Sequence, residues 1–209
     1  MPRSTNPFVR QVYFWWLIAP VLTALLVPAF CSDETLEIQP AEIELVEQCN
    51  RDVVAINESA SNHFLSWFVA TGIVKSSVSG SVHAEETGWT GYSRMGSLAH
   101  TWFTKFWKFV YRLIWRWTAF WPLYIAGVGG IALPCLIDGL VIRAKKRYEF
   151  GQYNPLAFNV AGTLFSLAVG WMVFVPMVPF ALTAVFMMGF FLVLGLVGWF
   201  ATSNFQRSA

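Results

Sequence analysis

The sequence predicts an all-α, polytopic membrane protein with four transmembrane helices, an outer amphipathic helix and an interfacial helix. Hydrophobic residues make up 56% of the 209 residues and charged residues only 12%, about half the charged share of a soluble domain. From Trp117 to Phe200 the chain is almost continuously apolar, with one basic interruption. Crossing a bilayer takes about 20 apolar residues. The predicted spans are 13–30, 117–142, 156–175 and 180–200.

The N-terminal run resembles a secretory signal, because Arg3 and Arg10 precede the apolar residues 13–30. Pro28 and Phe30 are poor neighbours for a small-residue cleavage site, so we expect an uncleaved first span. The resulting division is 1–30 (N-terminal segment and first span), 31–101 (periplasmic helix and flexible loop), 102–116 (interfacial amphipathic helix) and 117–209 (three-helix membrane domain with a basic loop at 143–155).

The basic loop sets the expected topology. Lys and Arg in short loops stay on the cytoplasmic side, and this loop carries Arg143, Lys145, Lys146 and Arg147. We therefore expect the loop and both termini in the cytoplasm and residues 31–116 outside. The same bases would bind anionic lipid or an acidic protein surface.

The outer segment begins with a predicted helix over 41–71, where apolar residues recur at spacings of three and four. Pro40 suits a helix start, Glu42 lies in the first turn beside the positive end of the helix dipole, and Gly72 suits a stop. The following residues, 75–97, are rich in Ser and Gly and predict a mobile loop.

Residues 102–117 combine one basic stripe with aromatic side chains on the remaining faces. The stripe consists of Lys105, Lys108, Arg112 and Arg116, spaced three and four apart. Bases toward phosphate and aromatic rings at headgroup depth are typical of an interfacial helix bound to membrane lipids. The alternative is that this segment extends the second span outward.

Cys31 and Cys49 both fall in the outer segment, where an oxidising periplasm permits a disulfide. Each could equally be a free, small apolar residue. Cys135 lies inside the second span, where packing is its expected role.

Catalytic and metal-binding patterns are not found. His63, His83 and His100 lack the local spacing of a zinc site, and no phosphate-binding loop or Cys-x-x-Cys occurs. We therefore expect no enzyme activity, no cofactor and no metal. The net charge of +2 is too small to predict direct, sequence-specific nucleic-acid binding.

Two polar side chains lie within the predicted spans. Asp138 is near the inner end of span two and Asn159 near the inner end of span three. A carboxylate in a span needs a partner or water, so the pair predicts a helix–helix lock or a carboxylate that already lies at the headgroups, with a proton or ion relay as the alternative. Glycines in these spans favour close helix packing, and Gly195 with Gly198 would also suit a homo-oligomer.

The stretch from Leu136 to Arg143, followed by Lys145, Lys146, Arg147 and Tyr148, resembles the Asp-Gly-Leu-Val-x-Arg segment of a family of conjugative-element inner-membrane proteins. The resemblance covers roughly 98–200, and Asp138, Gly139 and Arg143 match residue by residue. It implies a bacterial inner-membrane protein with one N-terminal span and three C-terminal spans. It also implies, as partners, the coupling ATPase or other type IV secretion proteins.

The residues and the resemblance together predict a non-enzymatic inner-membrane component of a conjugative DNA-transfer apparatus. The alternative is a small transporter or channel subunit that uses the intramembrane carboxylate of Asp138.

Overall fold

The computed structural model describes residues 14–86, 90–146 and 155–204, and over these residues all regular structure is helical. At 80–86, 90–96, 146, 155–159 and 161 only the backbone path is described. The predicted all-α class is confirmed for this part of the chain. The chain forms two compact units: unit 1 comprises 1–20, 122–175 and 183–209, and unit 2 comprises 21–121 and 176–182.

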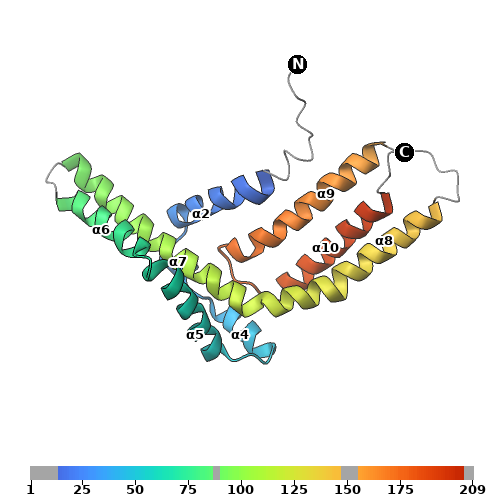
Figure 1. Cartoon of the computed structure of the whole chain (residues 1–209), viewed down its shortest axis with the longest axis horizontal. Coiled ribbons are helices and arrows are strands. Elements are labelled where there is room, and N and C mark those ends of the chain that lie inside the picture. Colours follow the sequence, from blue (N-terminus) through green and yellow to red (C-terminus); the bar gives the residue numbers. More distant parts are fainter. Residues whose placement is uncertain (1–13, 87–89, 147–154, 205–209) are drawn as a thin grey trace, which may run out of the picture. The chain divides into compact units, whose positions relative to one another are not determined.

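Unit 1 is built on three helices, and α10 lies between the other two (Figure 1). These helices are α8 (Leu133–Lys146), α9 (Pro155–Phe174) and α10 (Ala184–Asn204). Gly195 of α10 meets Cys135, and Gly198 meets Leu136. The predicted use of glycine for close helix approach is confirmed at these two positions. Gly189 is different, because a Cβ added there would have no atom within 4 Å.

The N-terminal end of the first apolar run packs against the C-terminal end of α9. This end is a π-helical turn, η1 (Phe14–Ile18), and the ring centroid of Trp15 lies 6.0 Å from that of Phe174. Trp16 lies beside Gly170. The expected topology separated residue 14 and residue 174 on opposite sides of the bilayer, so the cytoplasmic position expected for the N-terminus is not supported.

Unit 2 contains most of α2 (Ala19–Phe30), followed by α3 (Asp33–Leu36), α4 (Pro40–Gln48) and α5 (Val53–Phe64). The prediction of one helix over 41–71 is wrong, because α4 ends at Gln48 and Asn50 breaks the helix. Asn50 has a φ of 54°, and the amides of Asn50 and Arg51 bond back to the carbonyls of Glu47 and Val46, which is a Schellman stop. Asp52 then caps α5 by accepting a hydrogen bond from Val54 N at 2.8 Å.

After α5 the chain continues through the π-helical turn η2 (Leu65–Val69) to Gly72, whose φ of 74° ends this stretch as predicted. The mobile loop expected over 75–97 is wrong for 75–86 and 90–97, which are helical, and residues 87–89 lie outside the described residues. Residues 73–86 form α6 (Ile73–Glu86), which runs beside the first half of α7 (Thr90–Gly127) (Figure 1). Trp107 of α7 donates its indole N–H to Ser77 Oγ at 2.9 Å, so tertiary contacts hold this serine-rich segment as a helix.

The 38-residue α7 replaces the separate interfacial helix expected at 102–116. It continues through Pro122, which lacks the N–H that would bond the Thr118 carbonyl. Arg51 supplies the missing donor: its Nη1 lies 2.9 Å from Thr118 O and also bonds Ala119 O. The alternative, in which 102–116 extends the second span, is therefore the one that the structure shows.

Two helical stretches of the described chain, 97–145 and 184–204, are long and apolar enough to cross a membrane. The apolar helices at 14–30 and 162–177 are shorter, so the expectation of four full-length spans is met by two.

Candidate functional site

The most buried polar cluster among the described residues lies within unit 2, on the basic stripe of α7. Arg112 and Arg116 are 2% and 1% exposed, and Glu42 of α4 is 0% exposed. Glu42 Oε1 accepts a hydrogen bond from Arg112 Nη2 at 2.9 Å and a second from Arg116 Nη2. The amide of Leu182 adds a third bond to this oxygen at 3.2 Å. Segments far apart in the sequence thus meet at one carboxylate.

The two guanidinium groups also bind the carbonyls of the segment that joins α9 to α10. Arg116 donates to Pro176 O at 2.8 Å and to Phe180 O at 2.6 Å, and Arg112 donates to Pro179 O at 3.0 Å. This segment consists of a short 3-10 helix, η4 (Val175–Met177), and an irregular stretch over 178–183, and a buried carbonyl outside a regular helix needs another donor. The guanidinium, with five N–H groups in a fixed fork, can satisfy several at once.

The cluster holds two cations and one anion, and carbonyl dipoles compensate for the second cation. Removing one partner of such a buried ion pair typically costs about 3–5 kcal/mol, because a charge is left buried without compensation. The arrangement can therefore hold α4, α7 and residues 176–182 together. It contains no nucleophile beside a base, so we assign it a structural role.

The N-terminal half of the stripe, Lys105 and Lys108, is more exposed than Arg112 and Arg116 and also pairs within the chain. Lys108 Nζ lies 3.3 Å from Asp33 and 3.7 Å from Glu37, and Lys105 Nζ lies 3.0 Å from Cys31 O. Exposed pairs of this kind contribute about 0–1 kcal/mol each.

For Arg112 and Arg116 these contacts correct the prediction of lipid-phosphate binding, whereas for the half-buried Lys105 and Lys108 it stays a prediction. The spacing of the four bases was read correctly, but Arg112 and Arg116 are buried against Glu42. Glu42 was missed as a site residue. The signal was present, because residues 31–60 hold eight acids and a single base, which complement a stripe of four bases.

The aromatic faces of α7 also pack within unit 2 rather than only toward the bilayer. Trp115 is fully buried and donates its indole N–H to Asn57 Oδ1 at 2.6 Å. The ring of Phe64 lies edge-on to those of Trp107 and Tyr111. The long aromatic side chains of this segment thus join α5 to α7.

The cysteines are free thiols. Cys31 packs against the cluster of Leu36, Phe109 and Met177, while Cys49 is exposed at the end of α4. Of the two alternatives for this pair, the structure shows the unbridged one.

Asp138 has a partner that the sequence did not predict. Its Oδ2 accepts a hydrogen bond at 2.8 Å from the indole N–H of Trp199 on α10. The expected partner, Asn159, lies on α9, and its side chain is outside the described residues. Asp138 therefore locks α8 to α10, and no ion relay is seen among the described contacts.

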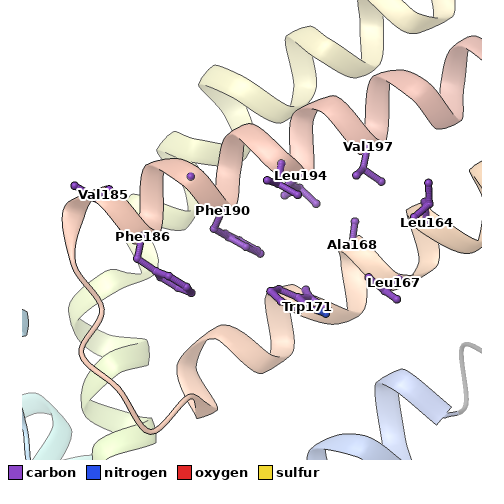
Figure 2. Close-up of a pocket in the computed structure, with 11 residues that line it drawn as sticks. Leu164, Leu167, Ala168, Trp171, Val185, Phe186, Phe190, Leu194 and Val197 are labelled. Carbon is purple, nitrogen blue, oxygen red and sulfur yellow. The ribbon is translucent and has the colours of Figure 1, made fainter.

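Side chains of α9 and α10 enclose an apolar groove of about 400 Å³ in unit 1. Figure 2 shows Trp171 and Ala168 of α9 pointing toward Phe190 and Leu194 of α10. The lining is hydrocarbon and aromatic, which suits helix packing or lipid chains and offers no reactive group.

The basic loop is described only at its start. Arg143 is half-buried and Lys145 exposed in the last turn of α8, where bases suit the negative end of the helix dipole. The side chain of Lys146 and all of Arg147 lie outside the described residues. Within the described part of the chain, no three His, Cys, Asp or Glu side chains are grouped to hold a metal ion.

Comparison with known families places the chain among plasmid conjugative DNA transfer proteins. A model of the DtrJ-like family, described as IncC plasmid conjugative DNA transfer protein DtrJ-like, matches residues 33–206, and the chain belongs to this family. The predicted link to conjugative elements is confirmed at this level, whereas the Asp-Gly-Leu-Val-x-Arg segment stays a prediction. No curated protein and no solved structure matches the chain.

Proposed function

We propose that this protein is a non-enzymatic, multi-pass inner-membrane component of the conjugative DNA-transfer apparatus. In this role it holds the coupling ATPase or another type IV secretion protein at the membrane. The observation that carries the proposal is the family match over 33–206, which assigns the chain to conjugative DNA transfer. Two helical stretches long enough to cross a bilayer support the membrane location.

The basic loop after α8 is the proposed docking surface. Arg143 and Lys145 end a membrane-length helical stretch, and Lys146 and Arg147 follow directly. In the proposed topology this loop and the C-terminus face the cytoplasm, where the motor domain of a coupling ATPase would lie. Charge-assisted hydrogen bonds to carboxylates would hold the partner.

Replacing Arg143, Lys145, Lys146 and Arg147 by Gln should reduce recovery of transfer proteins at least about tenfold, the factor that corresponds to 1.4 kcal/mol. The tagged full chain is purified in mild detergent from donor cells carrying the full transfer region, and its partners are quantified by mass spectrometry. A control replaces Lys75, an exposed base of unit 2, by Gln.

Orientation is checked separately, because the same bases direct insertion. In a variant with all three native cysteines changed to Ser, Ser79→Cys should react with an impermeant maleimide in intact cells, whereas Gln152→Cys should not. Normal labelling with undiminished partner recovery would contradict the docking role of the loop. Purification of the wild-type chain without any bound transfer protein would contradict the proposed function as a whole.

A further inference from the structure

The face of α7 opposite the basic stripe lines a groove of unit 2, which is separate from the apolar groove of unit 1. Successive residues of an α-helix are turned by about 100°, which places Trp117 and Trp121 roughly opposite Arg112. Together with Ser59 and His63 of α5 and Trp67 of η2, they line a groove of about 580 Å³. Arg112 and Arg116 are buried against Glu42, whereas this opposite face of α7 is open to an outside ligand.

The three tryptophans are exposed to a degree that is unusual for such large apolar side chains. Trp67, Trp117 and Trp121 are 56%, 61% and 50% exposed. Contiguous exposed apolar surface marks an interaction site. Trp117 and Trp121 directly precede the apolar residues 122–142 of a membrane-length helical stretch. Tryptophan is enriched at the ends of membrane-spanning helices, because its indole ring suits the lipid headgroup region.

The polar groups of the groove favour a ligand that accepts hydrogen bonds. His63 Nδ1 donates to the carbonyl of Ser59 at 2.7 Å, so this ring nitrogen carries a proton. The indole N–H groups of Trp67 and Trp121 make no hydrogen bond to the part of the chain that the structure describes. No acidic residue lines the groove. Phosphodiester and glycerol ester oxygens only accept hydrogen bonds, and they therefore complement this lining.

We propose that the groove between α5, η2 and α7 binds the headgroup of a bilayer phospholipid, with indole N–H groups donating to its phosphodiester and ester oxygens. The tryptophan rings cover the upper part of the acyl chains. This site lies on the face of α7 opposite Arg112 and Arg116, whose guanidinium groups are buried against Glu42. The inference rests on the proposed membrane location.

The test counts the phospholipid molecules that the full chain retains after purification from membranes in mild detergent, measured by native mass spectrometry. Two variants act on the groove in opposite ways: Trp67→Ala with Trp121→Ala removes its walls, and Ser59→Phe fills it. Phe30→Ala, an exposed aromatic residue of α2 that lines neither groove, is the matched control. We expect both groove variants to lose one lipid per chain relative to wild type and the control to lose none from this site.

A second measurement keeps the test valid if a variant folds poorly. Wild type and Trp121→Phe are reconstituted in vesicles whose phospholipids are brominated high on the acyl chains. The fluorescence of Trp121 is obtained by subtracting the emission of Trp121→Phe from that of wild type, and its quenching by bromine is measured. Strong quenching of this component is expected. Equal lipid retention in all forms, or an unquenched Trp121, would overturn the lipid site while leaving the membrane location intact. Recovery of wild type outside the membrane fraction would overturn both.

Discussion

Replacing Glu42 by Ala is expected to lower the free energy of unfolding of unit 2 by about 3–5 kcal/mol. The substitution removes the carboxylate that accepts hydrogen bonds from Arg112, Arg116 and Leu182 N. Two guanidinium groups then remain buried without the carboxylate that they share. The change in a single side chain thus affects α4, α7 and residues 176–182 together.

The measurement is denaturant unfolding of the full chain in detergent micelles, followed by tryptophan fluorescence. Glu47→Ala is the matched control, because Glu47 lies on the same helix but is exposed. A loss of stability no larger for Glu42→Ala than for Glu47→Ala would show that the buried network does not hold unit 2 together.

The second large effect is expected at Gly139 in α8. A Cβ built there would lie 2.7 Å from the backbone oxygen of Trp199, and it would also collide with Thr202 Oγ1. Backbone cannot rotate away as a side chain can, so Gly139→Ala must push α8 from α10. Overpacking of this kind costs about 1–3 kcal/mol, and it would also disturb the bond between Asp138 and Trp199.

Thermal unfolding in detergent, read by circular dichroism, measures this effect. Gly189→Ala is the control, because it is also a glycine of an apolar helix in unit 1 and has open space around its added Cβ. Ala is the better helix former by about 1 kcal/mol, so the control should be neutral or stabilising. Equal behaviour of the two variants would contradict the close approach of α8 and α10.

Local patterns predicted the elements better than their partners. Apolar periodicity and composition predicted the apolar helices, and the spacing of Lys105, Lys108, Arg112 and Arg116 identified a true stripe. The partner of that stripe is a long-range property, because Glu42 lies 70 residues before Arg112. Spacing alone does not distinguish a carboxylate of the same chain from a lipid phosphate.

The break at Asn50 could have been predicted. Asn just after a helix end and Asp two residues later are the usual stop and start residues. The apolar spacing of three and four continues across 41–71, however, and predicts a single helix there. The helix at 73–86 could not, since Ser and Gly disfavour it locally and its contacts come from Trp107 of α7. The bond between Asp138 and Trp199 likewise depends on which helix packs beside α8.

The buried network of Glu42 and Arg112 is tested most directly by a double-mutant cycle between Glu42→Ala and Arg112→Met. If Glu42 and Arg112 form one buried network, their effects on the free energy of unfolding should differ from additivity by at least about 1 kcal/mol. This result is expected because the second substitution removes one of the cations that the first leaves uncompensated. Additive effects would contradict a buried network of Glu42 and Arg112 and would indicate that Arg112 acts independently, as a lipid-facing base.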